Sequence, residues 1–203
     1  IPFTIFAVVG LTNAFNMADG MDGLAAGYFI LGFVTICAAL LFENGSILHL
    51  DWFIIWTSAV VGFILVNLSL VPIPKIFLGD SGSLLLGFII SWSLIFLSQE
   101  PVAILNPVAV IWTVAIPVYD TITVVFKRLS VKVSPFKADR QHIHHLLVDT
   151  GFPPRLVLTI ILLSSAVVNC VGLATLYFVS ASASVFLYFV LLGLFYFVCR
   201  LLG

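Results

Sequence analysis

Long apolar stretches constrain the fold of this chain more than any other feature of its 203 residues. About 20 apolar residues at a rise of 1.5 Å cross a hydrocarbon core roughly 30 Å thick. The chain is 62% hydrophobic and only 8% charged, whereas soluble domains are about one quarter charged. We therefore predict an all-α, polytopic membrane helix bundle in one domain (1–203), with a partial span at 1–12 and six full spans at 24–42, 52–71, 82–97, 102–126, 156–179 and 184–202.

The basic residues lie on one side of these predicted spans. Because consecutive spans run in opposite directions, the loops at 13–23, 72–81 and 127–155 share one side of the membrane with the C-terminus. All eight Lys and Arg residues fall on that side, and none falls in the loops near 43–51, 98–101 and 180–183. By the positive-inside rule, the side with the basic residues is cytoplasmic.

Net charge and cysteine placement exclude two kinds of function. A formal net charge of -1 does not provide the broad basic surface that a nucleic-acid partner requires. Cys37, Cys170 and Cys199 lie inside apolar stretches and form no CxxC pair. We therefore predict neither redox nor metal chemistry for them.

The first dense polar stretch is NAFNMADGMDGLAAG, at 13–27. Its Asn13, Asn16, Asp19 and Asp22 recur every three residues, and each such step turns about 60° around a helix axis. On one continuous helix these side chains would spread over half of the cylinder. We predict instead that the helix breaks near Gly20, so that carboxylates and amides converge on one ligand. The alternative is a solvated, Gly-rich loop in which an Asp caps the next helix.

The second polar stretch, KIFLGDSGS at 75–83, places Asp80 directly before an apolar span. The amide groups and dipole of a helix N-terminus favour an anion, so Asp80 is either a helix cap or a functional carboxylate. Mg²⁺ prefers one or two carboxylates together with substrate phosphate oxygens. With Asp19 and Asp22 on the same side of the membrane, we predict that Asp80 holds a divalent cation.

The third polar stretch, SPFKADRQHIHH at 134–145, is cationic. It contains five donor side chains, Lys137, Arg140, His142, His144 and His145. Such a run supplies the hydrogen bonds and the positive charge that a diphosphate requires. The alternative is a basic loop that rests on anionic lipid.

A zinc site in this stretch is not expected. A short helix capped by Asp139 and ending before Gly151 would carry all of its histidines. On that helix His142 and His145 share one face, and His144 points about 160° to 200° away from them. Three ligands so arranged cannot surround one tetrahedral ion, and no cysteine is near.

Two polar residues, Asn67 and Asp120, lie inside predicted spans near their cytoplasmic ends. A polar or ionisable residue at such a position is by default a functional candidate. Pro117, about one turn before Asp120, is expected to kink its helix toward the site. The alternative for both side chains is hydrogen bonding between helices.

These polar stretches resemble the signature motifs of a known family. NAFNMADGMDGLAAG, FLGDSGSLLLGF and SPFKADRQHIHHLL are similar to those of the polyprenyl-phosphate N-acetylhexosamine-1-phosphate transferases, which form glycosyltransferase family 4. The third motif is closest to the bacterial branch that starts O-antigen, enterobacterial common antigen or other envelope glycans. The resemblance implies transfer of GlcNAc-1-phosphate from UDP-GlcNAc to undecaprenyl phosphate, with release of UMP, at the cytoplasmic face of the bacterial inner membrane. It also implies Mg²⁺ as the cofactor, with Mn²⁺ as a substitute, and it is compatible with a homodimer.

The resemblance also assigns roles to individual residues. Asp80 matches a metal-binding aspartate, and Asp22 matches a second metal ligand. Phe77 matches an aromatic residue that stacks on uracil, and Asn16 and Asn67 match positions near the nucleoside. The residues predicted for catalysis are Asp19, Asp22, Asp80, His142, His144 and His145. The residues predicted for substrate binding are Asn16, Asn67, Phe77, Lys137, Arg140 and Asp120.

Two features depart from the family pattern. The family carries an Asp-Asp pair upstream, and no Asp-Asp dipeptide occurs here. Since the chain does not begin with Met, we expect that an N-terminal part precedes it and that these 203 residues alone release no UMP. Leu146 and Leu147 follow His145, whereas the related phospho-MurNAc-pentapeptide transferase continues into an acidic residue. That enzyme, or another family member with a different UDP-HexNAc donor, is the alternative function.

A membrane transporter is the alternative from a different class. A transporter would place ionisable residues and broken helices near the middle of the bilayer. The three dense polar stretches fall instead on one side of the predicted bundle. This placement favours an enzyme that takes one water-soluble substrate.

Overall fold

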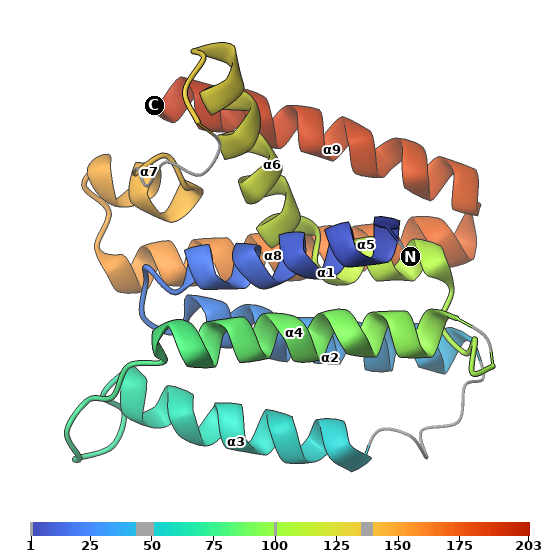
Figure 1. Ribbon diagram of the computed structural model, residues 1–203, viewed down its shortest axis with the longest axis horizontal. Coiled ribbons are helices and arrows are strands. Elements are labelled where there is room, and N and C mark those ends of the chain that lie inside the picture. Colours follow the sequence, from blue (N-terminus) through green and yellow to red (C-terminus); the bar gives the residue numbers. More distant parts are fainter. Residues whose placement is uncertain (1, 44–50, 100, 135–139) are drawn as a thin grey trace.

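The chain folds into a bundle of helices. The computed structural model describes residues 2–43, 51–99, 101–134 and 140–203, and in these ranges it contains no strand. The helices are α1 (Pro2–Ala18), α2 (Leu24–Phe42), α3 (Asp51–Asn67), α4 (Gly79–Ser98), α5 (Pro107–Thr113), α6 (Ala115–Ser130), α7 (Ile143–Asp149), α8 (Pro154–Phe178) and α9 (Ala181–Leu202). The long helices lie side by side, and α6 crosses their direction (Figure 1). The predicted all-α polytopic bundle is confirmed.

The six predicted full spans are not all confirmed in the described part of the chain. Within the described residues, α2, α4, α8 and α9 are long and apolar enough to cross a membrane. The pair α5 and α6 adds a fifth span if it is counted as one, although the two helices are bent by 72°. The helix at the predicted span 52–71 is shorter than predicted. Helix α3 ends at Asn67, and the chain turns at Ser69, which has a φ of 55°. Multiple apolar helices of this kind make the chain a multi-pass membrane protein.

The bend between α5 and α6 has a cause in the sequence. Pro117 has no N–H to donate to the carbonyl of Thr113, and its ring crowds that carbonyl. The helix breaks at Val114 and resumes with a hydrogen bond from the Val118 N–H to the Val114 oxygen, 3.1 Å long. The kink predicted from Pro117 is therefore present. It makes one apolar segment into two helices that run in different directions.

Close packing of α1 on α4 brings the first two polar stretches together. At Gly87 in α4, an added Cβ would lie 2.8 Å from the Thr12 Cα atom of α1. Only a glycine lets the two backbones approach so closely. One turn further along α1, the Asn16 amide reaches the start of α4, where it donates to Asp80 and to Ser83.

A second close approach lies in the core of the bundle, where α5, α8 and α9 meet. The buried ring of Trp112 rests directly on Gly172, and its Nε1 donates to Ser184 Oγ over 2.7 Å. Ser184 Oγ in turn donates to the Gly172 carbonyl over 3.1 Å. A Cβ added at Gly172 would lie 1.8 Å from a Trp112 ring atom. No side chain of any size fits there unless the helices move apart.

Gly172→Ala is therefore expected to lower the free energy of unfolding by about 3 kcal/mol, as overpacking of a tight core does. The measurement is thermal unfolding of the purified protein in detergent. Gly62→Ala in α3 is the matched control, since nothing lies within 4 Å of a Cβ added at Gly62. Equal unfolding midpoints for the two variants would contradict the expectation.

Candidate active site

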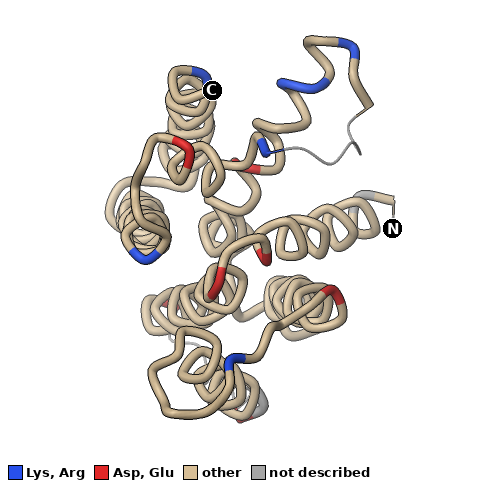
Figure 2. The backbone as a smooth tube through the Cα atoms, turned by 90° about the vertical axis from the view of Figure 1, so that its left-hand side faces the viewer, with Lys and Arg blue, Asp and Glu red and all other residues tan. Residues whose placement is uncertain are grey.

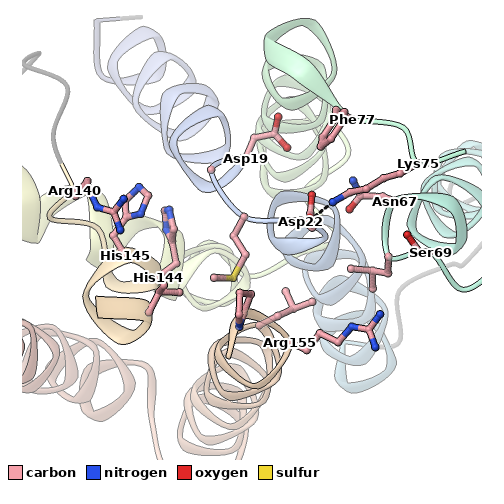
Figure 3. Close-up of a pocket in the computed structure, with 16 residues that line it drawn as sticks. Asp19, Asp22, Asn67, Ser69, Lys75, Phe77, Arg140, His144, His145 and Arg155 are labelled. Carbon is pink, nitrogen blue, oxygen red and sulfur yellow. Dashed lines mark hydrogen bonds and ion pairs between the residues drawn. The ribbon is translucent and has the colours of Figure 1, made fainter. Parts of the chain in front are cut away.

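Residues from the three polar stretches gather around one cavity at one end of the bundle. Its volume is about 520 Å³. Figure 2 looks onto this end of the molecule and shows acidic and basic positions around the helix ends. The cavity lies among the α1–α2 turn, the end of α3 and the loop after it, α7 and the start of α8 (Figure 3). Its lining residues are Asp19, Gly20, Met21, Asp22, Asn67, Leu68, Ser69, Lys75, Phe77, Arg140, His144, His145, Val148, Pro154, Arg155 and Leu158.

The α1–α2 turn supplies the acidic wall. Helix α1 ends at Ala18, and the Asp19 and Met21 N–H groups close turns onto Asn16 and Ala18. Helix α2 begins at Leu24 after Gly23, whose φ of 75° is a conformation that suits glycine. The helix break predicted near Gly20 is confirmed. It places both Asp19 and Asp22 on the cavity.

Negative charge accumulates at this wall. Burial raises the pKa of Asp19, and the nearby carboxylates of Asp80 and Asp22 act in the same direction. A hydrogen bond with the backbone of Gly79 opposes them. Carboxylates that repel one another in this way favour a bound cation between them.

Asp80 stands beside the acidic wall rather than on the cavity surface. Its Oδ1 accepts from Asn16 Nδ2 over 3.1 Å, and the same amide donates to Ser83 Oγ over 3.0 Å. Asn16 and Asp80 do not line the cavity, so the structure places them next to it. Ser83 was not identified from the sequence, because only the packing of α1 on α4 reveals its contact.

The donor set fits a cation that a substrate helps to bind. No cluster of three or more His, Cys, Asp or Glu side chains that could hold a metal occurs in the described ranges. Mg²⁺ requires only one or two carboxylates where phosphate oxygens complete its coordination. Asp22 and Asp80 are carboxylates of the kind required, and both lie near Asp19. Mg²⁺ at the acidic wall therefore remains a prediction.

The histidine segment forms the opposite wall, with a geometry that differs from the predicted one. Helix α7 begins at Ile143 with His142 as its N-cap residue, and Asp139 and Lys137 lie outside the described residues. Because His142 precedes the helix, the expected rotation of His144 away from its neighbours is wrong. The His144 ring centroid lies 6.0 Å from that of His142 and 4.1 Å from that of His145.

His144 is buried at the cavity wall without a hydrogen-bond partner. Its side chain is 2% exposed, and neither Nδ1 nor Nε2 has a partner. Burial lowers its pKa to about 4, with neighbouring His145 as the next cause. Burial also lowers the pKa of His145. The lowered pKa of His144 favours its neutral form, so His144 does not add to the positive charge predicted for this stretch.

Arg140 carries positive charge at this wall. Its Nη2 lies 2.7 Å from Asp149 Oδ1 at the end of α7, and both side chains are exposed. An ion pair this exposed is weak, so the guanidinium remains accessible to an anion in the cavity. Arg155, at the start of α8, lines the same cavity.

Asp120 holds the histidine segment in place. Its Oδ1 accepts from the Ile143 N–H over 2.8 Å, and its Oδ2 lies 2.8 Å from His142 Nδ1. Asp120 and His142 side chains are 13% and 7% exposed, and neither residue lines the cavity. The carboxylate thus joins α6 to the first turn of α7, from which His144 and His145 reach the cavity.

Asp120→Ala is therefore expected to loosen α7, because the Ile143 N–H and the His142 ring lose their acceptor. Amide hydrogen exchange across α7 should become several-fold faster, because two hydrogen bonds at its first turn are lost. The measurement is hydrogen-exchange mass spectrometry. The control is Thr121→Ala, whose hydroxyl donates to the Pro117 carbonyl within α6. Unchanged exchange in α7 would contradict the assignment.

Three polar residues on the cavity, Lys75, Ser69 and Arg155, were not assigned a role from the sequence. Lys75 forms an ion pair with Asp22, and its Nζ lies 4.9 Å from the centre of the Phe77 ring. Ser69 and Arg155 line the cavity as well. Lys75 and Arg155 were recognised only as basic residues on the predicted cytoplasmic side. The position of Lys75 two residues before Phe77 was the one available signal.

Asn67 joins the loop that carries Phe77 to the end of α3. Its Nδ2 donates to the Ile76 carbonyl over 2.9 Å. Its Oδ1 is buried without a partner, and the residue lines the cavity. Phe77 is 73% exposed at the cavity edge, so its ring is accessible to a flat ligand.

Comparison with known proteins shows which proteins this chain is similar to. Residues 1–98 match the family model described as glycosyl transferase family 4. An undecaprenyl-phosphate alpha-N-acetylglucosaminyl 1-phosphate transferase from Yersinia pestis is 39% identical over 170 residues, which are 83% of this chain and 46% of that protein. The chain is therefore similar to glycosyl transferase family 4 over residues 1–98 and to these transferases over most of its length. The resemblance found in the three polar motifs is thereby confirmed.

Other relatives carry similar names. The undecaprenyl-phosphate alpha-N-acetylglucosaminyl 1-phosphate transferase of Escherichia coli (strain K12) is 37% identical over 86% of this chain and 47% of its own length. A probable undecaprenyl-phosphate N-acetylglucosaminyl 1-phosphate transferase of Bacillus subtilis is 35% identical over 80% of this chain and 44% of its own length. The chain thus spans about half the length of these relatives. No solved structure matches it.

Proposed function

We propose that the protein transfers GlcNAc-1-phosphate from UDP-GlcNAc to undecaprenyl phosphate, releasing UMP, at the cytoplasmic face of the bacterial inner membrane. The lipid-linked sugar would start an envelope glycan such as the O-antigen of lipopolysaccharide. The names of relatives that are 35% to 39% identical support this reaction. The observation that carries the proposal is the convergence of the three polar stretches on one cavity of about 520 Å³.

Unpartnered polar atoms in this cavity support a polar ligand. Among the buried side-chain atoms without a partner, Asn67 Oδ1 and both His144 ring nitrogens belong to residues that line the cavity. A buried polar atom without a partner costs free energy, so a ligand that satisfies it gains affinity. UDP-GlcNAc offers N–H, hydroxyl and phosphate groups for these atoms.

The two walls suit the two ends of a nucleotide sugar. Phe77 offers a ring face for uracil at one edge of the cavity, next to Asn67. His144, His145 and Arg140 face the acidic wall from the other side (Figure 3). Mg²⁺ bound at Asp22 and Asp80 would neutralise oxygens of the diphosphate. Arg140, whose side chain is exposed, supplies positive charge and hydrogen-bond donors for a phosphate oxygen.

The net reaction exchanges one phosphorus–oxygen bond for another. A bond forms between an oxygen of the lipid phosphate and the phosphorus that bears the sugar. The bond from that phosphorus to the bridging oxygen breaks, and UMP takes the electron pair. Donors placed at the departing oxygens stabilise the charge that develops there. Arg140 and His144 line the cavity, and we propose this role for Arg140, with His144 behind it in the wall.

The cavity lies where a membrane-anchored acceptor can reach it. Its wall includes Pro154, Arg155 and Leu158 from the first turns of α8. Helix α8 is long and apolar enough to cross a membrane. A lipid phosphate at the membrane surface would therefore meet the cavity at the end of this helix.

The test is Mg²⁺-dependent UMP release by the full-length protein in lipid vesicles that contain undecaprenyl phosphate. UDP-GlcNAc should support release, and omission of the lipid should abolish it. UDP-MurNAc-pentapeptide, offered in parallel, distinguishes the related transferase. Release only with the pentapeptide donor would replace the proposed substrate, and no release with either donor would refute the proposed reaction.

A further inference from the structure

Lys75 lies between the two residues that the proposed ligands need. Its ammonium forms an ion pair with Asp22, predicted to bind the cation, and lies over the ring of Phe77, predicted to stack on uracil (Figure 3). The three residues line the same cavity. In this arrangement Lys75 is the counter-ion of Asp22 and covers one face of the Phe77 ring.

The loop that carries Lys75 is anchored, while the side chain itself is not. The Asn67 amide holds the backbone at Ile76, directly after Lys75, over 2.9 Å. The Lys75 and Asp22 side chains are 34% and 43% exposed, so water screens their ion pair. A cation–π contact at such an exposed position is also weak. The ammonium can therefore leave both partners without disturbing the loop.

A ligand forces that departure. A divalent cation at Asp22 repels an ammonium in contact with the same carboxylate. A base that stacks on the face of Phe77 covered by Nζ excludes the ammonium from it. The diphosphate that arrives with the base is an anion within reach of a flexible lysine on the same cavity wall, and lysine is a common phosphate donor.

We propose that Lys75 is an exchangeable counter-ion: it neutralises Asp22 in the free protein and moves to the diphosphate when the nucleotide binds. The lysine thus neutralises the charge of Asp22 in the free protein and charge of the diphosphate in the nucleotide-bound protein. The cation competes with Lys75 for Asp22, and the nucleotide base competes with it for the Phe77 ring. Binding of either one releases the lysine side chain. This proposal rests on the proposed function, because it assumes a nucleoside diphosphate in the cavity.

The test compares Lys75→Met with the wild-type full-length protein in detergent. The probes are Mn²⁺ alone, followed by electron paramagnetic resonance, and UDP with Mg²⁺ or uridine, followed by calorimetry. Lys75→Met should bind Mn²⁺ alone more tightly, because its competitor for Asp22 is gone. It should bind UDP about tenfold more weakly, because a charged hydrogen bond to phosphate is lost. Uridine, which has no phosphate, should bind equally well or better.

Two further variants make the result specific. Lys75→Arg keeps the positive charge and should retain UDP affinity. Lys132→Met removes an equal charge from an exposed residue after α6, away from the cavity, and should change nothing. If uridine affinity falls as much as UDP affinity, Lys75 only supports the loop and the proposal is overturned. Equal affinity of wild type and Lys75→Met for UDP, or for Mn²⁺, also overturns it.

These outcomes separate the two proposals. If the wild-type protein binds UDP and Lys75→Met binds it equally well, only the role of Lys75 is refuted. If the wild-type protein does not bind UDP, the proposed function fails, and the role of Lys75 fails with it.

Discussion

Asp80→Asn is expected to reduce UMP release by the full-length protein by about 1000-fold, a loss typical of removing one preorganised electrostatic contact. The amide has the same shape, and its oxygen can still accept from Asn16, as Asp80 Oδ1 does over 3.1 Å. The substitution therefore removes charge and leaves the packing of α1 on α4 intact. The measurement is initial rate against Mg²⁺ concentration, with the unfolding midpoint as a check on the fold.

Asp51→Asn is the matched control for this substitution. Asp51, like Asp80, is an acidic residue in the first turn of a helix, but it does not line the cavity. Its variant should release UMP at the wild-type rate. Wild-type release by Asp80→Asn at saturating Mg²⁺ would remove Asp80 from the cation site and leave Asp22 as the remaining predicted ligand.

Gly20→Ala is the second substitution with a large expected effect. A Cβ at this position would lie 2.9 Å from His144 Nε2. The backbone of Gly20 is not in the left-handed region, so alanine can adopt its conformation and the effect is steric. The buried His144 ring must move by a few tenths of an ångström or more. We expect UMP release to fall by about 100-fold, because a small displacement of a group that positions substrate typically slows an enzyme by that factor.

A double-mutant cycle tests whether Gly20 acts through His144. His144→Ala alone should lower UMP release, and adding Gly20→Ala should cause no further loss, because the ring that it displaces is absent. Gly10→Ala in α1 is the control, since nothing lies within 4 Å of a Cβ added there. Losses that multiply in the double variant would show that Gly20 affects the cavity by another route.

Much of the architecture follows from local properties of the sequence. The apolar stretches predicted the helices, because the backbone in a membrane satisfies its hydrogen bonds most simply within a helix. The spacing of Asn13, Asn16, Asp19 and Asp22 predicted the break near Gly20. Several boundaries differ from the prediction, and α1 for example continues to Ala18. The span predicted at 52–71 ends at Asn67, where the Asn67 amide bonds to Ile76, and the span predicted at 102–126 is divided at Val114.

The candidate site was predicted in part. The three polar stretches were expected to meet, and residues from each of them line one cavity. Within those stretches the sequence did not distinguish residues on the cavity from those behind it. Asp120 and His142 hold α7, while Lys75, which had no predicted role, pairs with Asp22. The roles of the site residues in catalysis and substrate binding remain predictions.

The sequence by itself determined that the chain is a helical membrane protein, on which side its polar stretches lie, and to which family its motifs are similar. These properties depend on composition, periodicity and charge, which are local. Only the tertiary structure decided which side chains share the cavity, that burial lowers the pKa of His144, and that Lys75 is the counter-ion of Asp22. Burial and contacts between residues far apart in the chain set these properties, because desolvation and Coulomb interactions depend on distances in the folded protein.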